Sequence, residues 1–213
     1  GRAGPVWSGV GFAVNDTAAG PGGVVLAGVT APDADRHPTA AEAARRALAD
    51  HLEAGEGRVL VRPAAEPERD RYDRLIAAVE TPEGDLAERL VREGWLIVWP
   101  RAGQNAAFDA LDAAEAEARR TGAGGWGDGA FTLDDPDPNR LAQKLDGPVI
   151  VEGLVVDTGT ARDGRVFVNF GLDWRTDFTA TADRDARDAF ESAGLDLTAL
   201  EGARGRVRGW LYE

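Results

Sequence analysis

The sequence predicts an α+β protein, mainly β, that is built from two small β-barrels. Three features favour this class. The apolar runs are short and end in Gly or Pro, the turns between the early strands are too short for parallel crossovers, and a Pro- and Asp-rich segment divides the chain. With 213 residues, of which 43% are hydrophobic, each half can bury a core of its own.

The first half alternates strand and helix patterns. Residues 9–14 and 24–29 predict a hairpin, and residues 57–64, 74–80 and 95–100 predict three more strands. Helices are expected over 38–55, 86–94 and 106–124. In the first helix, Thr39 and Glu42 form the expected cap, and the buried face is expected to hold Ala43, Ala47, Leu48 and Leu52. The order predicts a five-stranded barrel with three helices.

The second half is separated by LDDPDPNR, whose Pro and Asp residues predict a linker over 133–140 between domains 1–132 and 141–213. Beyond the linker, residues 147–159, 164–171 and 177–182 predict three strands, 184–194 a helix and 205–213 a last strand. This order predicts a second small barrel with one helix.

Composition excludes some kinds of function. A net charge of −13 argues against a general polyanion binder, because such binding needs Lys and Arg to neutralise phosphates. Without Cys there are no disulfides or thiolate metal sites. The two histidines, His37 and His51, are expected in solvent and do not suffice for a His cluster. No apolar run is long enough for a membrane span.

Five segments, in order, resemble the staphylococcal nuclease (thermonuclease) family. They are NDTAAGPGGVVLAGVTAPD, AAEAARRALADHL, DRYDRLIAAV, LAERLVREGWLIVW and AEAEARRTGAGGW, which together cover about residues 8–128. The resemblance implies an OB-fold barrel with a Ca²⁺-dependent phosphodiesterase site. VEGLV, VNFGLDWRTDFTA and AGLDLTALEGARGRVRGWL are similar to the OB-like domain that follows the nuclease domain in some bacterial members.

The resemblance also assigns roles to residues. Asp16, followed by Thr17, matches a metal-binding Asp, and Thr30 and Ala31 occupy two further metal-site positions, where the Ala31 carbonyl could still serve. Asp33 takes the place of the water-orienting Glu, and Arg74 matches a phosphate-binding Arg. The charges expected at two positions are missing, because Val25 replaces the other phosphate-binding Arg and Thr30 replaces a metal-binding Asp.

These losses predict a degenerate site that binds Ca²⁺ weakly or not at all, and a binding or scaffolding module with weak or no nuclease activity. Nucleic acid and protein partners both stay open. The runner-up is an active Ca²⁺-dependent nuclease, a hydrolase in which Arg74 and a second Arg, Arg36 or Arg71, together replace the missing charge.

A third hypothesis places the binding site in the second domain. There, Phe167, Trp174 or Trp210 would stack the bases of single-stranded nucleic acid, or bind an oligosaccharide, beside Arg204, Arg206 and Arg208. The chain starts at Gly1, as expected of a processed or trimmed chain, and family habit implies secretion or a periplasmic location. The residues themselves indicate neither the compartment nor the oligomeric state.

Overall fold

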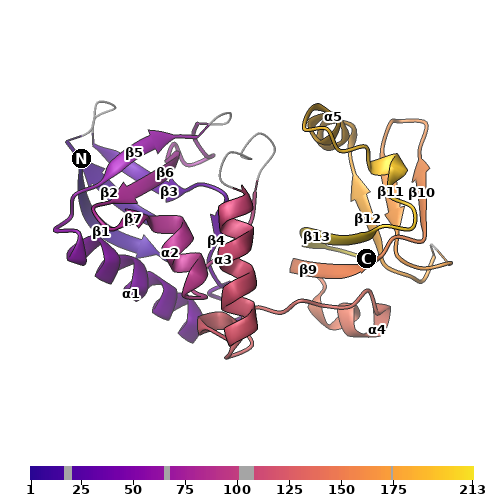
Figure 1. Cartoon of the computed structure of the whole chain (residues 1–213), viewed down its shortest axis with the longest axis horizontal. Helices are drawn as coiled ribbons and strands as arrows, with labels where there is room; N and C mark the ends of the chain where they lie inside the picture. The colour runs from indigo at the N-terminus through magenta and orange to yellow at the C-terminus, as the bar shows by residue number, and fades with distance from the viewer. Residues whose placement is uncertain (17–20, 65–67, 101–107, 174) are drawn as a thin grey trace. The chain divides into compact units, whose positions relative to one another are not determined.

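The computed structural model describes residues 1–16, 21–64, 68–100, 108–173 and 175–213. Backbone packing divides the chain into two compact units, Gly1–Phe131 and Thr132–Glu213 (Figure 1). Both units mix helices with strands, which confirms the α+β class. None of the helices in the described ranges has the length and apolar character that crossing a bilayer requires.

The main sheet of the first unit contains β1 (Arg2–Ser8), β2 (Gly11–Asn15), β3 (Gly22–Leu26), β6 (Leu75–Thr81) and β5 (Leu60–Pro63), in that order. The predicted hairpin is β2–β3, whereas β3 and β6 pair in parallel because a helix and β5 lie between them in sequence. Strand β7 (Gly84–Asp85) pairs with β6, and β4 (Val29–Thr30) pairs with β8 (Ile97–Val98).

The strand ladders in the described ranges do not close into the predicted barrel. A bridge between Arg2 and Arg58, together with backbone hydrogen bonds from Ala3 to Gly57 and between Gly1 and Val59, joins the start of β1 to the segment just before β5. Sequence analysis missed β1 entirely, because RAGPVWS has neither a clean alternation nor a continuous apolar run. A register shift between Ala3 and Val6 accompanies the irregular pattern.

The sheet has a buried face and an outer face in β2 and β3. Phe12, Val14, Val24 and Leu26 are buried in the core of the unit. Successive side chains of a strand point to opposite faces, so Gly11, Ala13, Gly23 and Val25 lie on the outer face. The outer face is therefore made of small and uncharged residues.

Three longer helices complete the first unit: α1 (Pro38–Ala54), α2 (Leu86–Arg92) and α3 (Phe108–Thr121). The N-cap of α1 is His37, with Pro38 at the first turn, so the expected cap at Thr39 is wrong. Its buried stripe is Ala40, Ala44, Leu48 and Leu52, which places Ala43 and Ala47 at the margin. The N-cap of α2 is Asp85, whose side chain accepts a hydrogen bond from the Glu88 amide.

Helix α3 carries a fully buried carboxylate, that of Glu115. Its Oε2 accepts a hydrogen bond from the Val98 amide at 2.8 Å, which ties α3 to β8. Its Oε1 lies 3.7 Å from Nη1 of Arg119, one turn further along the helix. The core tolerates this carboxylate because each of its two oxygens has a polar neighbour.

The second unit contains two small sheets. One is β10 (Asp157–Thr160), β11 (Val166–Asn169) and β12 (Thr179–Ala182), and the other pairs β9 (Gly147–Leu154) with β13 (Arg204–Leu211). The apolar run expected as one strand over 147–159 is two strands, β9 and β10. Helix α5 (Arg184–Ser192) begins at the Asp183 cap, and α4 (Pro138–Leu141) lies before β9. Two apolar clusters are buried in this unit, one around Val166, Val168 and Phe170 and the other around Leu141, Val149 and Val151.

Candidate functional site

Asp16 and Asp33 lie beyond opposite ends of the β2–β3 pair. Asp16 follows β2 at the end where Val14 pairs with Gly22. At the other end of the pair, the Leu26 amide donates a hydrogen bond to the Val10 carbonyl. Ala31 lies close to this end, because an added Cβ on Gly9 would lie 2.8 Å from Cβ of Ala31, and Asp33 follows Ala31 by two residues. The five residues of β2 alone span about 13 Å, whereas two oxygens on one Ca²⁺ are at most about 5 Å apart.

The residues around Asp33 do not fit a Ca²⁺ site. Thr30 pairs with Ile97 in the β4–β8 ladder. Ala31 packs against Gly9, and Ala44 of α1 packs against the same glycine. Within the described ranges no three Asp, Glu or His side chains gather closely enough to hold a metal ion. Calcium prefers six to eight oxygens, and Asp16 is too far away to add its carboxylate to the set. Thr17, the other part of that motif, lies outside the described residues.

Asp33 is used locally as a turn residue. Its Oδ1 accepts a hydrogen bond from the Asp35 amide at 2.9 Å, and its carbonyl accepts one from the His37 amide at 2.7 Å. Oδ2 lies 3.8 Å from Nε of Arg36. These contacts bring the chain into the first turn of α1, so the carboxylate has a structural role beside the role that the resemblance assigns to it.

Arg74 is held by Asp70 at the start of β6. Its Nε donates to Asp70 Oδ2 at 2.7 Å, and Nη2 lies 2.6 Å from the same oxygen. The amides of Tyr72 and Arg74 donate to the other oxygen, Oδ1. Burial raises the pKa of Asp70, but the hydrogen bonds from Arg74 and from the two amides outweigh it and lower the pKa below its ordinary value.

Two guanidinium groups lie over the ring of Tyr72. The Cζ atoms of Arg71 and Arg74 are 4.8 Å and 4.9 Å from the ring centroid. Arg71 therefore stays within the 70–74 turn, beside Arg74. Arg36, the other replacement considered for the missing charge, lies beside Asp33 instead. The turn 70–74 thus brings two guanidinium groups and an exposed aromatic ring together with two carboxylates, those of Asp70 and Asp73.

An indole ring, which sequence analysis did not single out, covers the outer face of β2 and β3. An added Cβ on Gly11 would lie 2.3 Å from Trp7 Nε1, and one on Gly23 would lie 3.2 Å from Trp7 Cη2 and 3.0 Å from Arg74 Cγ. The ring of Trp7 and the stem of Arg74 thus meet over Gly23. Val25, the substituted phosphate position, is the cross-strand neighbour of Gly11. We call Trp7, Gly11, Gly23, Val25 and Arg74 the Trp7 face.

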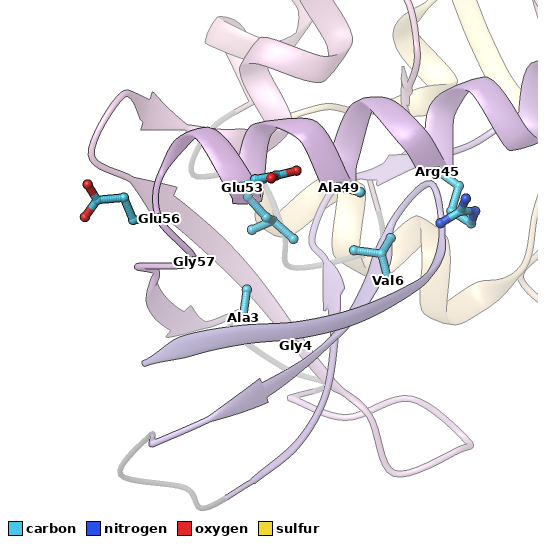
Figure 2. Close-up of a pocket in the computed structure, with 9 residues that line it drawn as sticks. Ala3, Gly4, Val6, Arg45, Ala49, Glu53, Glu56 and Gly57 are labelled. Carbon is cyan, nitrogen blue, oxygen red and sulfur yellow. The ribbon is translucent and has the colours of Figure 1, made fainter.

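Two hollows flank α1, away from the Trp7 face. Figure 2 shows the first, of about 400 Å³, between β1 and α1, where Ala3, Val6 and Ala49 form an apolar lining. Arg45 at its rim is bound by Glu42, and hydrogen bonds from Arg45 and Arg46 lower the pKa of Glu42 to about 2. The second, of about 650 Å³, holds His51, whose Nε2 lies 2.9 Å from Glu93 Oε2. His51 is largely buried, so the expectation of a solvated side chain is wrong.

The second unit separates the residues of the third hypothesis. Phe167 lies in the β10–β11–β12 sheet beside Arg165, whereas Trp210 lies on β13 in the other sheet and is 59% exposed. Arg204 and Arg206 both bind Glu152 across the β9–β13 ladder. Trp210 lines a hollow of about 630 Å³ with Arg208 and Phe178. Trp174 lies outside the described residues.

Comparison with known families identifies the first unit. A family model described as staphylococcal nuclease homologue matches residues 23–128. These bounds include β3 through α3, with Val25, Thr30, Asp33 and Arg74, and leave β1 and Trp7 outside the match. A search of curated proteins found no match to the chain.

Proposed function

Since the chain belongs to the staphylococcal nuclease family through residues 23–128, we propose that it binds its partner without hydrolysing it. In this proposal the first unit is an OB-type domain whose metal and phosphate sites are degenerate. The second unit is an OB-like domain that serves the same binding or scaffolding role. The partners considered are nucleic acid, which fits the family, and protein.

The separation of the charged groups across the sheet is the observation that supports this proposal most strongly. Metal-assisted phosphodiester cleavage needs carboxylates on one cation and guanidinium groups on the same phosphate. In this chain Asp16 and Asp33 lie beyond opposite ends of β2–β3. Val25 is apolar, Thr30 is uncharged, and Arg74 already binds Asp70.

The rate consequence is large. Loss of one group that stabilises developing charge typically slows catalysis by about 10² to 10³, and this chain lacks both the Arg at Val25 and the Asp at Thr30. The Trp7 ring also lies beside Val25, where a phosphate would approach the sheet. The indole carries no positive charge, so it does not replace the missing guanidinium.

Hydrolysis of fluorescently labelled single- and double-stranded DNA by the full chain tests the proposal. With Ca²⁺ in excess, we expect cleavage no faster than in EDTA, and no change on replacing Asp33 or Arg74 by Ala. Ca²⁺-dependent cleavage that disappears in Asp33→Ala and Arg74→Ala would show an active nuclease and overturn the proposal. Cleavage that survives both substitutions would point to a contaminant, which a repeat purification of the Asp33→Ala variant would identify.

A further inference from the structure

Two strands of the second unit each have one edge without a partner strand. Within the described residues β12 pairs only with β11, and β13 pairs only with β9. No residue of β12 or β13 is buried, whereas most of β9 is. Residues of both strands line the hollow of about 630 Å³, so the two open edges border one groove, which we call the β12–β13 groove. An open strand edge is a template for a further strand.

On β12 the hydrogen-bond pattern shows which backbone groups the open edge offers. The Phe170 amide donates to the Phe178 carbonyl at 3.0 Å, so Phe178 directs its backbone groups toward β11. Residues of an antiparallel strand alternate in this respect. The N–H and C=O groups of Thr179 and Thr181 therefore point away from β11, and the described part of the chain offers them no backbone partner.

On β13 the same alternation identifies a second row of groups. The Leu211 carbonyl accepts a hydrogen bond from the Asp146 amide, so Leu211 directs its carbonyl toward β9. Its neighbour Trp210 therefore directs its N–H and C=O groups away from β9. An extended polypeptide carries N–H and C=O groups along both of its edges, so one added strand can bond to β12 and to β13 at once.

The side chains of β13 indicate what sequence such a strand should have. Val207 and Leu211 pack against the two apolar clusters of the unit. The other face of β13 carries Arg204, Arg206 and Arg208, because successive side chains point to opposite faces. Side chains that lie opposite each other across a ladder share a face. An added strand should therefore place apolar residues beside Val207 and Leu211, and its alternate residues beside the arginines.

Glu152 shows which side chain suits the arginine face. It lies opposite Arg206 in the β9–β13 ladder and accepts hydrogen bonds from Arg204 and Arg206, at 3.3 Å and 3.1 Å. Two carboxylates also line the groove, but Asp177 already accepts a hydrogen bond in the turn before β12, and Glu213 lies beyond the end of β13. Three arginines with one carboxylate across the ladder favour acidic residues on a strand added at the other edge.

We propose that the β12–β13 groove binds an extended segment of a protein partner, in which apolar and acidic residues alternate, as an added strand. This inference rests on the proposed function, because it names the partner class of the second unit in a chain that binds without cutting. The four residues of β12 set the length of the paired part at about 13 Å. Main-chain hydrogen bonds supply affinity, and the alternating faces supply specificity.

Fluorescence anisotropy of a labelled ten-residue peptide that alternates Val and Glu, titrated with the full chain, tests the inference. The peptide should bind more tightly than one with Lys in place of Glu, and more tightly than one with the same residues in two blocks. Methylating every second amide removes the donors toward one edge. Either set of methyl groups should weaken binding by about 5- to 150-fold, the loss expected for two hydrogen bonds.

Variants of the chain test each edge of the groove. Thr181→Pro removes an amide that points away from β11, so the ladder stays intact and binding should weaken by about 2- to 12-fold. Arg208→Glu reverses a charge on the arginine face and should weaken binding by about 2- to 30-fold. The matched control is Arg162→Glu, which makes the same change of charge at an exposed residue outside the groove and should leave the affinity unchanged.

Amide hydrogen exchange, followed by NMR, locates the peptide. The amide protons of Thr179 and Thr181 should exchange more slowly when the Val–Glu peptide is bound, because they then donate to it. Ala180, whose amide faces β11, is the internal control and should change little. A peptide bound elsewhere would not produce this alternation along β12.

Several results would overturn the inference. These are a Val–Glu peptide that does not bind, binding equal to that of the block peptide, and binding that leaves the exchange of Thr179 and Thr181 unchanged. A dimer in analytical ultracentrifugation with both amides protected before peptide is added would assign the groove to a second copy. Protection by an oligothymidylate instead of the peptide would assign it to nucleic acid. Either result would contradict a protein partner.

The remaining outcomes are also decisive. If circular dichroism shows that Thr181→Pro does not fold, Arg208→Glu and the methylated peptides still test both edges, because they leave β12 unchanged. Ca²⁺-dependent hydrolysis of DNA by a chain that still binds the peptide would overturn the proposed function alone. A chain that neither cleaves DNA nor binds the peptide would overturn this inference alone.

Discussion

At the scale of single residues, Asp70 decides where the guanidinium of Arg74 points. Its side chain is 8% exposed and accepts hydrogen bonds from Arg74 and from two amides of the 70–74 turn. Two of its donors are backbone groups, so the carboxylate shapes the turn as well as pairing with the guanidinium. The first residue of DRYDR thus has a structural role, because Asp70 holds both the turn and the Arg74 guanidinium.

Replacing Asp70 by Ala should lower the free energy of unfolding at neutral pH by about 1 to 3 kcal/mol, because amides and a guanidinium lose a charged partner. The pKa of Asp70 is lowered in the folded chain, so its contribution is present above the ordinary value of 3.8 and is lost as the pH falls through the folded value. Urea denaturation from neutral to acidic pH measures both effects.

The control for this prediction is Glu117→Ala. Glu117 makes an exposed i,i+3 pair with Arg120, and such pairs contribute little to stability. The two variants should therefore differ at neutral pH and converge in acid. An Asp70→Ala variant as stable as the wild type would show that the turn 70–74 does not depend on the carboxylate.

Several site residues could be predicted from the sequence, and others could not. Asp33 and Arg74 stand in short motifs with near neighbours, so their local turns follow from the residues beside them. The place of Trp7 depends on Gly11 and on Gly23, which another strand supplies. Predicting such a contact requires the register between β1 and β2. The sequence RAGPVWS has no periodic pattern from which that register could be predicted.

At the scale of elements, the end of α2 meets the turn after α3 backbone to backbone. Gly94 has φ +77°, and a Cβ there would lie 2.0 Å from the carbonyl oxygen of Ala123. The Gly94 carbonyl in turn accepts a hydrogen bond from the Gly125 amide at 2.9 Å. Only glycine can hold this approach, since both the left-handed conformation and the contact exclude a side chain.

Gly94→Ala should therefore destabilise the first unit by about 3 kcal/mol, the sum of the left-handed penalty and an overpacked contact. Gly129→Ala is the matched control, because Gly129 has φ +81° with no atom within 4 Å of an added Cβ. It should cost only the conformational term, about 1 to 2 kcal/mol. Equal losses in thermal melts of the two variants would contradict the steric argument.

Most helices and strands could be predicted because their signals are local. The periodicity of α1, α2 and α3 and the alternation of β5 and β6 lie within single windows of sequence. The cap of α1 was misplaced because Pro38 favours the first turn, which puts the boundary one residue before it at His37. The parallel β3–β6 pair and the open ladders depend on contacts between distant segments, and no local pattern encodes those.

At the scale of the whole molecule, each unit has its own apolar core. The first core gathers Phe12, Leu48, Leu90 and many others, and the second gathers Val155, Val166, Phe170 and Leu197. The smaller unit buries a smaller fraction of its surface and should be the less stable one. Stability is therefore expected to divide along the chain between Phe131 and Thr132.

A fragment ending at residue 131 should thus fold on its own and melt cooperatively near the main transition of the full chain. Calorimetry of the full chain should show an additional, lower transition from residues 132–213. Circular dichroism of the isolated fragment provides the comparison. A fragment 1–131 that shows no cooperative melting would indicate that the two units form one folding unit.

The carboxylate of Glu115 has a consequence for how the first unit opens. The hydrogen bond from the Val98 amide to Glu115 lies inside the core. If α3 moved away from β8, this bond would break and leave the carboxylate and the amide without their partner in apolar surroundings. We therefore expect α3, β8 and the β4 strand that pairs with β8 to unfold locally as one unit and not one element at a time. The Val98 amide proton would then exchange with solvent only when this whole block detaches.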